Sequence, residues 1–127
     1  MMIHGQKTVL IADDEYTNYL YLSELIKSSD ASVIYASNGL EAVDLFKGDT
    51  SIILVLMDIR MPILNGFLAT KWMKDLRPEV PVFAQTAYAL ESDLKNLESR
   101  FDGYFIKPIH REDFIQKLSK YINFNNH

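Results

Sequence analysis

The chain of 127 residues contains no cysteine, which excludes disulfides and thiolate metal sites. It carries no excess of positive charge. Its formal net charge of −4 at pH 7 predicts no basic face for nucleic acid. No apolar run approaches the ~20 residues that cross a bilayer, and residues 1–7 lack the apolar core of a signal peptide. We therefore expect a cytoplasmic domain without nucleic-acid or membrane contact, or the cytosolic part of a membrane-anchored chain.

Length and composition predict a single globular domain over residues 1–127, with its core at about residues 7–122. A chain of this size can bury roughly two thirds of its unfolded surface. Its hydrophobic content of 48% and charged content of 24% are ordinary for such a domain. No linker or repeat interrupts the chain, and only residues 123–127 are expected to form a tail.

Short apolar runs alternate with segments of helical periodicity. The runs predict five strands, at residues 8–12, 31–36, 51–57, 82–85 and 104–106. The other segments predict helices at residues 15–28, after residue 38, and at residues 67–76, 90–97 and 112–122. This alternation is typical of βα units and a parallel sheet, with right-handed crossovers that place helices on both faces.

Two of these helices carry more specific expectations. Asn38 is expected to cap the second helix, with Glu41 reaching back in a capping box. The third helix is expected to pack through its large apolar residues, which are Leu68, Trp72, Met73 and Leu76.

Polar residues stand at the downstream ends of four of the predicted strands. Asp13 and Asp14 follow the first strand, Asp58 the third, Thr86 the fourth and Lys107 the fifth. Parallel strands share one carboxyl edge, and ligands bind outside that edge. Three acids, a hydroxyl and an amine would meet there. This set is suited to a hard cation and a phosphoryl group.

Five short motifs carry a resemblance to a known family. They are residues 13–15 (Asp-Asp-Glu), 57–62 (Met-Asp-Ile-Arg-Met-Pro), 65–66 (Asn-Gly), 86–87 (Thr-Ala) and 107–108 (Lys-Pro). In this order and spacing they resemble the receiver domain of two-component response regulators, over residues 7–122. The resemblance implies a flavodoxin-like, doubly wound α/β fold, whose five-stranded parallel sheet has the order 2-1-3-4-5 and carries five helices.

The resemblance also implies an activity. Asp58 would accept a phosphoryl group from the phosphohistidine of a sensor histidine kinase or of a histidine phosphotransfer domain. The reaction would need Mg²⁺, with Mn²⁺ as an alternative ion. Asp14, Asp58 and the backbone carbonyl of Arg60 would hold the ion directly, and Asp13 would act through a bound water. Lys107 would offset charge on the phosphoryl group.

Five residues are implied to surround or read the phosphoryl group. Thr86 would bond to it and move inward, and Tyr104 would follow as an aromatic switch. Ala87 would leave room beside it. Arg60 and Tyr88 would flank it, and because both are large we hypothesise that they restrict the attacking water and prolong the phosphorylated state.

Alternatives remain open at this point. Asp13 or Asp14 could cap the first helix, Lys107 could be a surface lysine, and Tyr104 could be an ordinary strand residue. A Mg²⁺-dependent aspartyl-phosphate phosphatase is disfavoured, because Arg60 stands where such enzymes usually carry a second acid. A receiver-like module that is not phosphorylated is disfavoured by the complete acid set.

The resemblance does not imply a conventional enzyme, although such a domain phosphorylates and dephosphorylates itself. The loop at residues 57–62, followed by residues 66–70 (Gly-Phe-Leu-Ala-Thr), most resembles the receivers of hybrid histidine kinases, which favours that context over a free-standing protein. A dimer that forms on phosphorylation is a further alternative, and the downstream protein partner is not indicated. The resemblance also implies that the bond before Pro108 is commonly cis.

Overall fold

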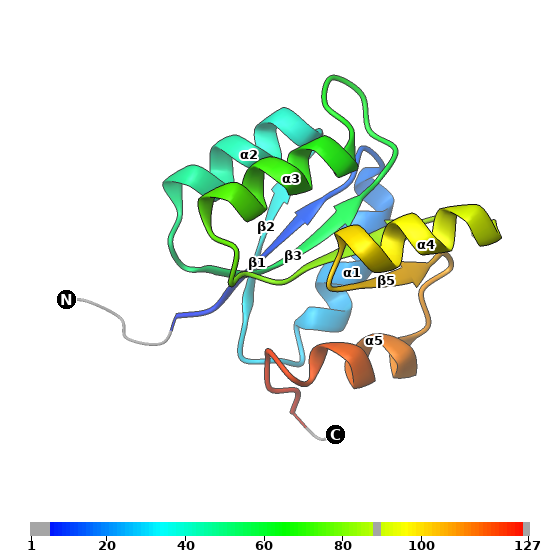
Figure 1. The fold of residues 1–127 in the computed structure, drawn as a ribbon. Coiled ribbons are helices and arrows are strands. Elements are labelled where there is room, and N and C mark those ends of the chain that lie inside the picture. Colours follow the sequence, from blue (N-terminus) through cyan, green and yellow to red (C-terminus); the bar gives the residue numbers. More distant parts are fainter. Residues whose placement is uncertain (1–5, 88–89, 126–127) are drawn as a thin grey trace.

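The computed structural model describes residues 6–87 and 90–125. Its parallel strands form one sheet in the order β2-β1-β3-β4-β5 (Figure 1). The strands are β1 (Thr8–Ala12), β2 (Ser32–Ala36), β3 (Ile52–Asp58), β4 (Val82–Thr86) and β5 (Gly103–Ile106). The helices are α1 (Tyr16–Ile26), α2 (Gly39–Gly48), α3 (Gly66–Leu76), α4 (Glu91–Arg100) and α5 (Arg111–Leu118). The predicted fold class, strand order and five helices are confirmed.

The helices cover both faces of the sheet, with α2 and α3 on one side and α1 and α5 on the other (Figure 1). Successive strand residues point to opposite faces, so the core has two halves. Leu10, Val55 and Ala84 pack with residues of α2, α3 and α4. Leu54 and Phe105 pack with residues of α1 and α5. None of the helices in the described ranges is long and apolar enough to cross a membrane.

The N-terminus of α2 follows the predicted cap with one difference. The Asn38 side chain accepts a hydrogen bond from the Glu41 backbone N–H at 2.8 Å, as expected. The Glu41 carboxylate accepts from the backbone N–H of Ser37 at 2.7 Å, one residue before the cap. The Asn38 cap is therefore confirmed, but the Glu41 side chain bonds to the backbone of Ser37 and not to that of Asn38.

The prediction for the buried face of α3 was largely wrong. Of the four residues expected to pack, only Met73 is buried. Leu68, Trp72 and Leu76 are 40%, 41% and 48% exposed and form a stripe along the outer flank of the helix. The inward stripe consists of Gly66, Ala69, Thr70 and Met73. Three of these residues, Gly66, Ala69 and Thr70, are small, which suits a face that lies directly beside α2 (Figure 1).

The expected C-terminal tail is wrong for residues 123–125, and residues 126–127 lie outside the described chain. Helix α5 ends at Leu118, four residues before the predicted end. Asn123 then exchanges hydrogen bonds with Asp30, its backbone N–H reaching Asp30 Oδ1 at 2.9 Å. Phe124 pairs with Ser29 and lies edge-on to the ring of buried Phe114. The end of the described chain is thus held against the α1–β2 connection.

Candidate functional site

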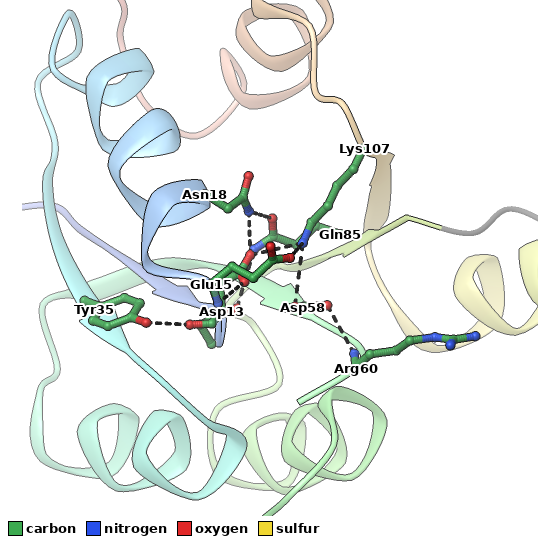
Figure 2. A network of polar contacts seen from close by, with 9 residues as sticks. Asp13, Glu15, Asn18, Tyr35, Asp58, Arg60, Gln85 and Lys107 are labelled. Carbon is green, nitrogen blue, oxygen red and sulfur yellow. Dashed lines mark hydrogen bonds and ion pairs between the residues drawn. The ribbon is translucent and has the colours of Figure 1, made fainter. Parts of the chain in front are cut away.

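The structure brings Asp13, Asp58 and Lys107 together at the carboxyl edge of the sheet (Figure 2). Carboxylate oxygens of Asp13, Asp14 and Asp58 all lie within 4.8 Å of one another. The Lys107 Nζ lies 3.3 Å from Asp13 Oδ2 and 3.6 Å from Asp58 Oδ2. Thr86 ends β4 at the same edge, is buried, and accepts the Lys107 backbone N–H at 2.7 Å through its carbonyl.

Asp13 is fully buried and bonded through both carboxylate oxygens. Its Oδ1 accepts the backbone N–H of Glu15 at 2.8 Å. Its Oδ2 accepts from the Asn18 side chain and faces Lys107. Its backbone carbonyl accepts the Tyr35 hydroxyl at 2.8 Å. These contacts favour one orientation of the carboxylate. The residue before α1 is Glu15, so Asp13 bonds to the turn that leads into the helix and is not its cap.

Asp58, at the end of β3, is the acid whose ionisation the site perturbs most clearly. Its Oδ1 accepts the Arg60 backbone N–H at 3.1 Å. Burial is the main cause that raises the pKa of Asp58 to about 7, and the charges of Asp13 and Asp14 act in the same direction. The Arg60 hydrogen bond and the Lys107 charge oppose this rise. The negative charge of ionised Asp58 is therefore not fully compensated by the Lys107 ammonium group and the Arg60 hydrogen bond.

This arrangement fits a hard divalent cation. Three carboxylates converge, and Glu15 adds a fourth negative charge 3.9 Å from Lys107, so one ammonium group faces several acids. Asp14 is exposed, and its oxygens are therefore open to an ion approaching from solvent. Carboxylate oxygens are ligands that Mg²⁺ prefers, and that ion retains several waters. The residues present could therefore hold such an ion.

The loop after β3 has an unusual backbone. Ile63 has φ 71°, a left-handed conformation that β-branched residues rarely adopt. The Leu64 N–H donates to the Pro62 carbonyl at 2.7 Å across it, which makes a three-residue γ-turn. Earlier in this loop, the exposed Arg60 side chain extends away from Asp58 (Figure 2). A shielding role for Arg60 would therefore need another rotamer.

The remaining predicted residues have different positions. Tyr104 is half-buried on β5, and its carbonyl accepts the Lys117 Nζ at 3.0 Å. Ala87 follows Thr86 and is exposed. Tyr88, predicted to flank the phosphoryl group, lies outside the described residues. The peptide bond between Lys107 and Pro108 is cis, as the resemblance implied.

Sequence reasoning missed Asn18, Gln85 and Tyr35, whose side chains all contact Asp13 or its neighbours. Asn18 and Gln85 hydrogen-bond to each other at 2.8 Å. One signal was present: Gln85 is a polar residue inside an otherwise apolar predicted strand, and a buried amide needs partners. The partner itself lies 67 positions away in the chain and becomes evident only from the folded structure.

A parallel sheet of order 2-1-3-4-5, with an acidic cluster and a lysine at its carboxyl edge, defines a flavodoxin-like α/β domain with a charged site at that edge. The response regulator receiver domain family matches residues 9–119. The chain therefore belongs to the receiver domains of two-component signalling.

Individual relatives agree with this assignment. The polar-differentiation response regulator DivK of Brucella anthropi is 37% identical over 120 residues, which cover 91% of this chain and 96% of the relative. The receiver domain of the sensor histidine kinase PA1611 from Pseudomonas aeruginosa has a TM-score of 0.81 at 26% identity, with 92% of this chain and 98% of that one covered. That structure has a magnesium ion coordinated in the active site cleft.

A third match comes from a complex. The co-crystal structure of the Saccharomyces cerevisiae histidine phosphotransfer signaling protein Ypd1 with the receiver domain of its downstream response regulator Ssk1 also matches this fold. Its TM-score is 0.81 at 26% identity, with 94% of this chain and 91% of the matched chain covered.

Proposed function

We propose that this domain accepts a phosphoryl group on Asp58 from a protein phosphohistidine and changes conformation in response. The observation that carries the proposal is the convergence of Asp58 with Asp13, Asp14 and Lys107 at one edge of the sheet. In the reaction an Asp58 oxygen forms a bond to phosphorus while the phosphorus–nitrogen bond to the donor histidine breaks. The product is an aspartyl phosphate that stays on the protein.

The other acids and the lysine have separate roles in this proposal. Asp14, Asp58 and the Arg60 carbonyl would hold Mg²⁺ (or Mn²⁺), and Asp13 would contact it through water. When bound, the ion would neutralise carboxylate and phosphoryl charge and favour the ionised, nucleophilic form of Asp58. Lys107 already faces Asp58 and would pair with a phosphoryl oxygen.

The signal would pass through β4 and β5. We propose that Thr86 donates a hydrogen bond to the phosphoryl group and that half-buried Tyr104 repacks when Thr86 moves. Ala87 would leave space beside the phosphate. Arg60 and Tyr88 remain our candidates for slowing the attack of water. Because Tyr104 packs against the half of the core shared with α4, a change there would reach the surface of that helix.

The partner class follows from the donor chemistry. A sensor histidine kinase or a histidine phosphotransfer protein would supply the phosphoryl group, as the Ypd1 complex with the Ssk1 receiver illustrates for another member of the fold. We propose that this receiver domain lies in the cytoplasm, either in a response regulator or at the cytosolic end of a hybrid kinase. The relatives include a response regulator and the receiver of a sensor kinase, which supports both contexts.

The proposal predicts one phosphorylation site. Incubation with Mg²⁺ and acetyl phosphate should add one phosphoryl group to the intact mass of the wild-type protein and none to Asp58→Asn. Asp75→Asn, an exposed acid on α3, is the matched control and should be modified like the wild type. A modified Asp58→Asn protein, or an unmodified wild type, would contradict the assignment.

Lys107→Ala should bind Mg²⁺ more tightly but accept phosphoryl groups more slowly. The ammonium group lies within 3.6 Å of two of the acids, so its loss removes a competing positive charge. We expect the Kd for Mg²⁺ to fall about three- to tenfold at low ionic strength. Calorimetric titration measures this, and Lys120→Ala, an exposed lysine after α5, is the control. Unchanged or weaker binding in Lys107→Ala would contradict the competing role of the lysine.

A further inference from the structure

Three elements meet beneath the acidic cluster through a closed ring of side-chain amides. The Asn18 Nδ2, in the first turn of α1, donates to Asp13 Oδ2 and, at 2.8 Å, to Gln85 Oε1 (Figure 2). Gln85 lies on β4, and its Nε2 donates to the carbonyl of Ala12 at 3.5 Å. Because Ala12 directly precedes Asp13, the bonds return to their starting point.

Each hydrogen bond of the ring has a fixed donor and a fixed acceptor. The Ala12 carbonyl only accepts, so the NH₂ group of Gln85 must face it and the Gln85 side-chain oxygen is left as an acceptor. The Asp13 carboxylate also only accepts, so the NH₂ group of Asn18 donates both to Asp13 and to Gln85. Gln85 is 1% exposed and Asp13 is 0% exposed, so water does not readily replace a lost bond.

The ring limits what Asp13 can do for a cation. A carboxylate offers about four acceptor positions. One on Oδ1 is taken by Glu15, and Oδ2 faces both Asn18 and Lys107. The remaining capacity on Oδ1 suits a water bound to the ion better than direct coordination by both oxygens. Asn18 thus fixes the orientation in which Asp13 meets the ion.

The ring also connects Asp13 to β4, the strand that ends at Thr86. Gln85 directly precedes Thr86 and is paired in register with Asp58. The Gln85 carbonyl accepts the backbone N–H of Ile59 at 3.3 Å. Gln85 therefore contacts the end of β1 through its side chain and the residue after β3 through its backbone.

We propose that Asn18 and Gln85 are positioning residues that act as one unit and set the Mg²⁺ affinity of the acidic cluster through Asp13. This inference rests on the proposed Mg²⁺ site. Groups that orient a metal ligand from behind typically change affinity by about 10- to 100-fold when removed. Neither residue needs to touch the ion, the phosphoryl group or Asp58.

The test is Mg²⁺ titration of Asn18→Ala, Gln85→Met and the double variant, without phosphodonor. Each single variant should raise the Kd roughly tenfold. The double variant should resemble the singles, because one substitution already opens the ring. The Glu15 amide NMR signal should shift in each variant before any Mg²⁺ is added. Asn96→Ala and Gln116→Met, at exposed positions on α4 and α5, are matched controls and should leave the Kd unchanged.

The possible outcomes separate the two proposals. A wild-type protein that does not bind Mg²⁺ would overturn the proposed function. A wild type that binds Mg²⁺ together with single variants that bind equally well would overturn only this inference, even if their melting temperatures fall. If the double variant bound Mg²⁺ about a hundredfold more weakly than the wild type, the two tenfold effects would multiply. That result would show that Asn18 and Gln85 act independently, and would contradict the proposal that they act as one unit. Asn18→Ala keeps the test valid if Gln85→Met fails to fold, since Asn18 is only half-buried.

Discussion

Asp58→Asn is expected to be more stable than the wild type at pH 8 in the absence of divalent cations, by roughly 2 to 4 kcal/mol. The reason is that burial and neighbouring acids raise the pKa of Asp58 from an unfolded value near 3.8 to about 7. Asparagine keeps the shape of the side chain and removes the charge. The corresponding rise in melting temperature is on the order of 10 °C.

The pH dependence of this gain follows from the direction of the pKa shift. Below about pH 3 the carboxyl is largely protonated in both the folded and the unfolded chain, so its ionisation does not affect stability. As pH rises from about 4 to about 7, the unfolded chain releases the proton and the folded protein retains it, so wild-type stability falls. The advantage of the variant should therefore be small at pH 4 and largest above pH 7.

Urea unfolding in EDTA from pH 4 to pH 8 measures this effect, with Asp75→Asn as an exposed control that should change stability by less than about 0.5 kcal/mol. Saturating Mg²⁺ should narrow the difference, because an ion that binds the folded wild type stabilises it. A gain of equal size at all pH values would point to packing and would contradict an origin in ionisation.

Gly39→Ala should destabilise the fold by about 2 to 3 kcal/mol, although alanine is the better helix former. A Cβ at this first residue of α2 would lie 2.0 Å from the carbonyl oxygen of Leu64 and 2.8 Å from its carbonyl carbon. Both are backbone atoms of the loop that contains the γ-turn, so no side-chain rotation relieves the overlap. The same displacement should weaken Mg²⁺ binding, because this loop leads from Asp58 and Arg60.

Gly48→Ala at the other end of α2 is the matched control. A Cβ there meets no atom within 4 Å. It should stabilise the protein by about 0.5 to 1 kcal/mol through helix propensity. Denaturant unfolding compares the two variants directly. Equal stabilities for Gly39→Ala and the wild type would show that the loop moves aside at little energetic cost.

Much of the fold could be predicted because β-branched and apolar runs mark parallel strands, and because acids, a hydroxyl and a lysine directly follow them. The outward orientation of the large apolar residues of α3 could not be predicted in this way. Its large residues and its small residues both recur at helical spacing, and only the proximity of α2 decides that Ala69 and Thr70 face inward. The amide ring escaped prediction for a related reason. Asn18 looks like an ordinary polar helix residue until β4 is placed beside β1.

The hydrogen bonds between Asn123 and Asp30 have a practical consequence for experiments on the isolated domain. They place the end of the described chain beside the start of β2, at the amino ends of the strands (Figure 1). The acidic cluster lies at the carboxyl ends of β1 and β3. A fluorophore, affinity tag or surface tether joined there would lie away from the carboxyl edge of the sheet, where Asp58 is found. A pull on such a tether would act first on the hydrogen bonds between Asn123 and Asp30, and therefore on the α1–β2 connection.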